Sequence, residues 1–125
     1  MAGTDLAARP SGDNARMAYD EVLADRIRPI IGARGETTER KMFGGITWML
    51  EGNMACGVLG DDVCVRLQPE DGDRALEEPG TRPFDMTGRP ARGFIVVAGD
   101  SVRDDDALAR WVNAGADYAL SLPPK

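Results

Sequence analysis

The first part of the chain with a clear apolar pattern has the period of a helix. Its apolar residues recur at three- and four-residue steps, the spacing that places side chains on one helical face: Tyr19, Val22, Leu23, Ile27 and Ile30. Pro29 lacks an amide hydrogen and disfavours helical geometry at the residue before it. Because Gly32 and Gly35 follow, we expect regular helix to end near residue 32.

Three apolar runs come next, at residues 46–50, 54–59 and 63–67, and residues with turn chemistry separate them at 51–53 and 60–62. A two-residue turn at Gly60-Asp61 sets the register of the second hairpin. The resulting pairs are Val58 with Val63, Cys56 with Val65, and Met54 with Leu67. All six side chains then lie on one sheet face, so the pattern predicts a three-stranded antiparallel meander.

The C-terminal half adds shorter elements and one long helix. Residues 69–78 are typical of a short surface helix, residues 84–86 of an irregular strand, and residues 94–98 of a strand inside the sheet. A last helix opens within Ser101 to Asp104, where side-chain oxygens can accept from free amides. Its expected buried face is Leu108, Trp111, Val112, Gly115 and Ala119.

The order of these elements is α-β-β-β-α-β(β)-α. It predicts an α+β fold, a two-layer sandwich in which an antiparallel sheet of 4–5 strands carries helices on one face. Residues 1–16 are rich in Gly, Ala, Pro, Ser and Asp, and we expect a flexible N-terminal extension there. Residues 17–125 are then a single domain, without internal repeats.

Composition narrows the function classes. The chain has 125 residues, 21 acidic against 15 basic side chains, and a net charge of −6, which makes direct binding of nucleic acid unfavourable. No apolar run is long enough to span a bilayer, and no signal sequence is evident, so we expect a cytoplasmic protein. Histidine is absent, which removes the commonest general base and zinc ligand.

Two cysteines, Cys56 and Cys64, are the only ones in the sequence. Structural zinc needs four ligands, so we expect no metal site and no other cofactor. In the predicted register Cys64 faces Gly57, on the sheet face opposite Cys56, and a disulfide is geometrically disfavoured. The carboxylates fall in turns and at a helix start, where capping explains them. We therefore expect no catalytic residues and no enzymatic activity.

The most unusual segment runs from residue 40 to residue 45, where cations, large apolar residues and glycines are crowded ahead of a strand: Arg40, Lys41, Met42, Phe43, Gly44 and Gly45. A structural interpretation has the apolar pair in the core and the glycines shaping the strand entry. A functional interpretation makes the segment a binding surface. Three further arginines, Arg82, Arg89 and Arg92, could join Arg40 and Lys41 in an anion-binding surface, although scattered surface arginines are the simpler explanation.

Six short motifs have the order and spacing found in one protein family. They are Met17-Ala18-Tyr19-Asp20, residues 39–45, Gly52-Asn53-Met54-Ala55, Pro83-Phe84-Asp85, Thr87-Gly88-Arg89-Pro90 and the Trp111-Val112 helix. Over residues 17–124 the chain resembles the N-terminal domain of the TfoX/Sxy family. The resemblance implies the two-layer sandwich predicted above and a relation to bacterial regulators of competence. Named members carry a second, C-terminal domain, so the chain looks like a stand-alone copy.

These observations favour a protein-binding regulatory module that uses Arg40, Lys41 and Phe43 as its contact set. The alternative is a small-molecule or anion-binding domain built on Arg40, Lys41, Arg89 and Arg92. Direct nucleic-acid binding is a weaker third hypothesis, since the regulatory family suggests it and the charge opposes it. A homodimer through a sheet edge or face stays open, because the edges of an antiparallel sheet must be covered, charged or paired.

Overall fold

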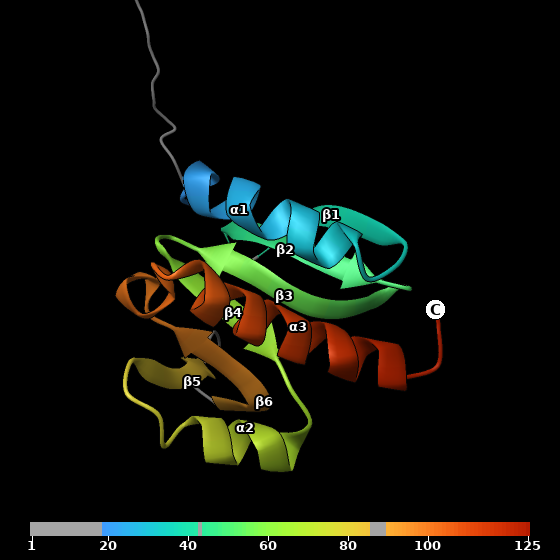
Figure 1. The fold of residues 1–125 in the computed structure, drawn as a ribbon. Helices are drawn as coiled ribbons and strands as arrows, with labels where there is room; N and C mark the ends of the chain where they lie inside the picture. The colour runs from blue at the N-terminus through green and yellow to red at the C-terminus, as the bar shows by residue number, and fades with distance from the viewer. Residues whose placement is uncertain (1–18, 43, 86–89) are drawn as a thin grey trace, which may run out of the picture.

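The computed structural model describes residues 19–42, 44–85 and 90–125. Along the chain the elements are α1 (Glu21–Gly32), β1 (Thr37–Met42), β2 (Gly45–Leu50), β3 (Asn53–Leu59), β4 (Asp62–Arg66), α2 (Pro69–Ala75), β5 (Thr81–Asp85), β6 (Pro90–Val97), the 3-10 helix η1 (Gly99–Val102) and α3 (Asp105–Ser121). Figure 1 shows this arrangement, with α1 and α3 side by side in front of the strands.

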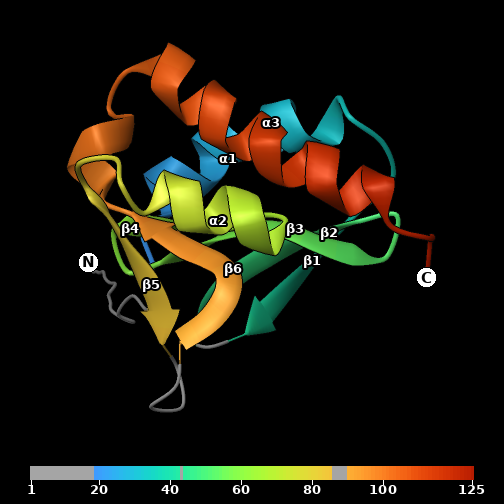
Figure 2. The same cartoon turned by 90° about the horizontal axis from the view of Figure 1, so that it is seen from below.

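The strands form one six-stranded sheet in the order β1-β2-β3-β4-β6-β5, and every neighbouring pair is antiparallel. Figure 2 shows the three α-helices on one face of this sheet. α1 and α3 pack against the middle strands, and α2 packs against β6. The predicted α+β two-layer sandwich is confirmed.

The expected number of strands, four to five, was wrong. The apolar pattern predicts no strand at Thr37–Met42, whereas the structure forms β1 there. β1 pairs with β2 from Thr37–Leu50 to Met42–Gly45. All four central residues of β1 are exposed, so the segment has none of the apolar alternation that indicates a half-buried strand. Its pairing depends on β2, and only its two threonines carry β propensity.

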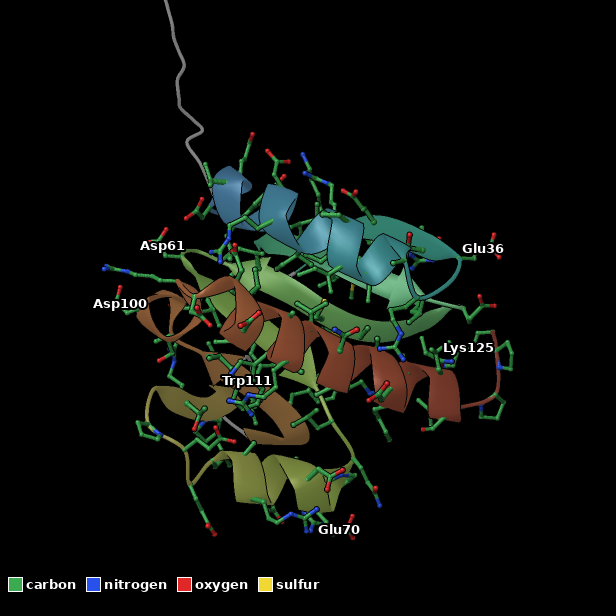
Figure 3. All side chains as sticks on the ribbon, in the orientation of Figure 1. Glu36, Asp61, Glu70, Asp100, Trp111 and Lys125 are labelled. Carbon is green, nitrogen blue, oxygen red and sulfur yellow. The ribbon has the colours of Figure 1, made fainter. Side chains whose placement is uncertain are left out.

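The main core lies between the helices and the sheet. Trp111 of α3, which is only 4% exposed, points into this layer, whereas Glu36, Glu70 and Asp100 point outward (Figure 3). The predicted buried face of α3 is confirmed. So is its start: the N-cap side chain of Asp104 accepts a hydrogen bond from the Ala107 amide at 3.0 Å.

α1 ends at Gly32 as expected, and Pro29 is accommodated inside it. The predicted buried face was partly wrong, because Val22 is 70% exposed. The face that enters the core is rotated and includes a small residue: Leu23, Ala24, Ile27 and Ile31. The predicted face was chosen from the large apolar side chains alone. The small side chain of Ala24 also lies on the buried face, where α1 packs against the sheet.

The register of the β3–β4 hairpin is confirmed for Val58 with Val63 and for Cys56 with Val65. The third predicted pair was wrong. A register shift in β2–β3 pairs Trp48 with Cys56 but Met49 with Met54, so Ala55 is an extra residue in β3. Because of this bulge, Met54 and Cys56, two positions apart, lie on opposite faces of the sheet. Met54 therefore leaves the helix side.

The sheet face away from the helices carries a second, smaller apolar cluster. Its buried members are Met54, Cys64, Phe84 and Val96. Cys64 faces Gly57 and Cys56 belongs to the other face, as the register predicted. Both cysteines are free and buried. Burial raises the pKa of the Cys64 thiol to about 12 and raises that of Cys56 further, so both stay protonated at neutral pH.

The end of the chain is held at the β2–β3 turn. The Lys125 amide donates to the Glu51 carbonyl at 3.0 Å, and the Asn53 side-chain amide donates to the Pro123 carbonyl at 2.9 Å. Gly52 has a positive φ of 85° and lies directly against Lys125, where a larger residue would collide with its backbone. The Gly52-Asn53 motif thus has a structural role. No helix in the described part of the chain is long and apolar enough to cross a membrane.

Candidate functional site

The segment at residues 40–45 forms the end of the β1–β2 hairpin. Met42 pairs with Gly45, which leaves a two-residue loop. Met42 is half-buried, and its sulfur accepts a hydrogen bond from the Thr47 hydroxyl at 3.2 Å. Phe43, which was expected in the core or in a contact surface, lies outside the described residues. The structure therefore gives Met42 a packing role and leaves the place of Phe43 untested.

The two glycines shape the hairpin in different ways. Gly44 is exposed and has a positive φ of 76°, which a glycine adopts without strain. Gly45 is buried, and a Cβ at this position would overlap the Val58 carbonyl of β3. The first glycine permits the turn, and the second permits a close approach of β2 to β3. These geometries agree with the structural interpretation of the pair.

Arg40 and Lys41 are both exposed, and neighbouring positions in a strand face opposite sides of the sheet. Arg40 faces Thr47, away from the helices, and Lys41 faces Ile46, on the helix side. Neither side chain forms an ion pair within the described residues. The pair therefore presents one cation above and one below the edge of the sheet.

Most other cations of the described chain are neutralised by a carboxylate. The pairs are Arg26–Asp105, Arg28–Asp25, Arg28–Glu39, Arg34–Asp117, Arg74–Asp71, Arg82–Asp62, Arg92–Asp73, Arg103–Asp100 and Arg110–Glu78. Within that part of the chain only Arg40, Lys41, Arg66 and Lys125 have none. Arg66 instead lies between two rings, 5.5 Å from that of Phe94 and 5.4 Å from that of Tyr118. Arg40 and Lys41 are thus the two adjacent cations left for a partner.

Glu39, the acidic residue next to Arg40, is already engaged. Both of its carboxylate oxygens accept from the Arg28 guanidinium, at 2.8 and 3.0 Å. These hydrogen bonds lower the pKa of Glu39, so the carboxylate is ionised and held against α1. Arg28 also lies 6.0 Å from the ring of Trp48. The negative charge of β1 is therefore compensated from within the molecule, and the strand is locally cationic.

The anion-binding cluster expected from Arg40, Lys41, Arg89 and Arg92 is not assembled in the described residues. Arg92 lies on β6, and three strands separate β6 from β1. Its guanidinium is 2.8 Å from the Asp73 carboxylate. Arg82 is 3.0 Å from Asp62, and Arg89 lies outside the described residues. Arg40 and Lys41 remain together, and Arg82 and Arg92 are engaged elsewhere.

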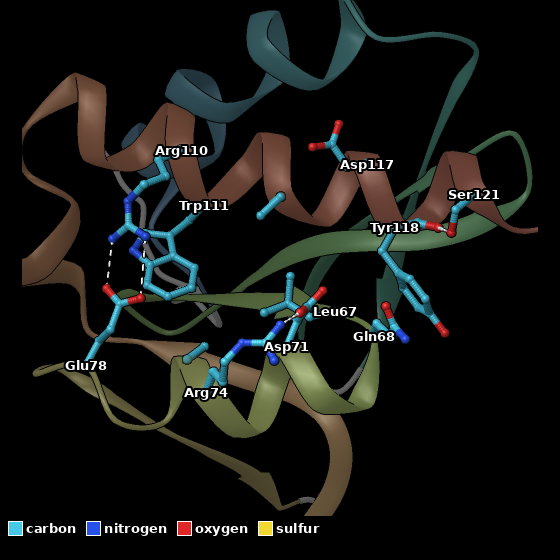
Figure 4. Close-up of a pocket in the computed structure, with 12 residues that line it drawn as sticks. Leu67, Gln68, Asp71, Arg74, Glu78, Arg110, Trp111, Asp117, Tyr118 and Ser121 are labelled. Atoms are coloured by element: carbon cyan, nitrogen blue, oxygen red, sulfur yellow. Dashed lines mark hydrogen bonds and ion pairs between the residues drawn. The ribbon is translucent and has the colours of Figure 1, made fainter.

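A groove of about 460 Å³ lies between α2 and α3 (Figure 4). Trp111 and Leu67 line it, and Glu78 closes one end by an ion pair with Arg110 at 3.0 Å. Arg74 on its rim is paired with Asp71. No sequence pattern indicates this groove, because its two walls are about forty residues apart and each is an ordinary surface helix. Its charges neutralise one another, so it has no distinct preference for anions or cations.

The described residues contain no group of three or more His, Cys, Asp or Glu side chains that could hold a metal ion. The fold and this surface define a small α+β sandwich with a cationic, exposed edge strand. Comparison with known families then gives a match to the TfoX N-terminal domain over residues 30–119, and the chain belongs to that family. A search of curated proteins finds no match. The resemblance inferred from the six motifs is confirmed.

Proposed function

We propose that this TfoX N-terminal domain is a non-enzymatic regulatory module of the cytoplasm that acts by binding a protein partner through β1. The observation that carries the proposal is the pair Arg40 and Lys41, which are adjacent, exposed and without a carboxylate partner in the described chain. Family membership supports the regulatory role. A relation to competence rests on resemblance to the two-domain members and belongs to the proposal.

Charge supports a protein partner over nucleic acid. The chain carries a net charge of −6, so a polyanion as long as DNA would meet repulsion outside the β1 surface. A protein segment with a few carboxylates, by contrast, can bind through Arg40 and Lys41 alone. Unpaired surface cations of this kind speed association with an acidic partner and fix its orientation. Small anions are less favoured, because Arg40 and Lys41 lie on opposite faces and do not converge.

The test is capture of partners by tagged protein from nuclease-treated lysate of its own host, followed by mass spectrometry. We expect Arg40→Glu/Lys41→Glu to lose a protein that the wild type retains, because charge reversal at an interface replaces attraction by repulsion. The matched control is Arg74→Glu/Arg103→Glu, which changes the net charge equally at two exposed arginines that already have carboxylate partners.

Both variants must keep the wild-type circular dichroism spectrum and melting temperature. A partner that survives reversal at Arg40 and Lys41 contradicts the proposed surface. If the control alone loses the partner, the contact lies away from β1, either at the groove between α2 and α3, which Arg74 lines, or near Arg103. A captured species that disappears on nuclease treatment supports nucleic-acid binding instead, and its affinity should then fall steeply with salt.

A further inference from the structure

The two edges of the sheet differ in a way that matters for recognition. β5, at one edge, contains Pro83, which has no amide hydrogen, and its pairing with β6 shifts register between Pro83 and Asp85. Proline and bulges are devices that block the addition of another strand. β1, at the other edge, has no proline and pairs with β2 in continuous register over six residues. Only the β1 edge is suited to receive a strand.

The backbone groups that β1 directs outward can be identified from its register. Glu36 accepts from the Glu51 amide, and Arg40 accepts from the Thr47 hydroxyl, so the carbonyls at these two positions point toward β2. In an antiparallel pair, inward and outward residues alternate. Thr37, Glu39 and Lys41 therefore direct their amides and carbonyls away from the sheet. No described strand pairs with them.

We propose that β1 binds its partner by strand addition, and that the partner segment is extended and acidic. This inference rests on the proposed function and names the chemistry of its partner. An added strand pairs with the outward groups of Thr37, Glu39 and Lys41, as in other cases of edge-strand recognition. Two consecutive acidic residues in it point to opposite faces. One reaches Arg40 and the other reaches Lys41.

Charge makes a second copy of this chain a poor occupant. A two-fold axis that joins two β1 strands in one continuous sheet brings residues of the same face opposite each other. The two most fully overlapped registers then place Glu39 against Glu39, or Arg40 against Arg40 with Glu39 opposite Lys41. In neither register does Arg40 or Lys41 meet a carboxylate that is not already engaged by Arg28. Like charges directly opposite each other destabilise a strand pair. An acidic strand from another protein instead places its carboxylates against Arg40 and Lys41, which have no carboxylate partner in the described chain.

The experiment uses a labelled eight-residue peptide in which valine and threonine flank a central Asp-Glu pair, with fluorescence anisotropy as the readout. We expect saturable binding to the full chain that weakens at least tenfold when Asn-Gln replaces Asp-Glu. Glu39→Pro removes the central outward amide and should weaken binding at least tenfold. Glu39→Val, the matched control, loses the same carboxylate but keeps the amide, and it should bind at least tenfold more tightly than Glu39→Pro.

Amide exchange followed by NMR provides a second readout that needs no variant. The peptide should slow exchange at Thr37, Glu39 and Lys41 and leave Thr38 and Arg40 nearly unchanged, since these two already face β2. Absence of saturable peptide binding, or binding without protection of the outward amides, overturns the proposal. A change in sedimentation that shows self-association through β1 also overturns it, in favour of a second copy.

The two proposals can fail separately. If Arg40→Glu/Lys41→Glu loses a lysate partner that Glu39→Pro retains, the protein-binding function stands and strand addition is wrong. If the peptide binds with the expected protection but lysate yields no partner sensitive to either variant, β1 accepts acidic strands and the proposed function is wrong.

Discussion

The free energy of unfolding is expected to fall steeply as the pH rises above about 9, because two thiols are buried in their neutral form. Desolvation raises the pKa of Cys64 to about 12 and raises that of Cys56 further. An unfolded cysteine ionises near pH 8.5. Below that pH the thiols are protonated in both the folded and the unfolded chain, so their contribution to the free energy of unfolding is complete. Above it only the unfolded chain ionises.

The loss amounts to about 1.4 kcal/mol per pH unit for each thiol, until the pH reaches the folded pKa. Urea unfolding at about pH 8 and pH 10.5 should therefore differ by several kcal/mol. Cys56→Val/Cys64→Val removes both groups and keeps the sites apolar, and its alkaline loss should be much smaller. Every other side chain is the same in the two proteins, so its effect cancels in the comparison. Equal losses in wild type and variant would show that the thiols are not responsible.

Gly115→Ala is expected to lower the free energy of unfolding by about 1–3 kcal/mol, although alanine is the better helix former. A Cβ at Gly115 would overlap the Ala55 carbonyl, where the bulge in β3 brings the strand against α3. That carbonyl belongs to the sheet backbone and cannot move aside as a flexible side chain would. The helix must shift outward, which loosens the packing around Trp111.

The matched control is Gly32→Ala at the end of α1. Apart from its chain neighbours and the backbone of α1 itself, no atom lies within 4 Å of the Cβ position there, and φ is not positive. The substitution should raise the free energy of unfolding by about 0.4–1 kcal/mol, because alanine restricts the unfolded chain. Urea denaturation of the two variants should thus give opposite signs for the same chemical change. A Gly115→Ala protein as stable as the Gly32→Ala protein would mean that α3 does not approach β3 so closely.

Sequence patterns predicted α3 well because their signals are local. The Asp104 cap lies within three residues of the amide that it accepts from, and the apolar stripe from Leu108 to Ala119 repeats within one helix. The Gly60-Asp61 turn likewise set the register of β3 and β4 within a few residues of itself. In the candidate site, the sequence indicated Arg40 and Lys41 as possible binding residues, because cations, large apolar residues and glycines are rarely crowded together ahead of a strand.

Contacts between segments far apart in the sequence decided the rest. β1 became a strand because β2 pairs with it, and its polar side chains gave no apolar alternation to indicate this. Met54 changed face because a bulge inserted Ala55, which depends on how β2 and β3 fit together. The partners of Arg92 and Arg28 lie on other elements, so the sequence could not show which cations were already neutralised.

The sequence by itself thus determined the family, the α+β class and the order of most elements, since turns, caps and periodic apolar positions act over a few residues. Tertiary structure decided that Thr37–Met42 is an open edge, that the β5 edge is blocked, and that Arg40 and Lys41 lack carboxylate partners in the described chain. Edge position and charge neutralisation are properties of spatial neighbours. They are settled only when strands and helices distant in sequence come together.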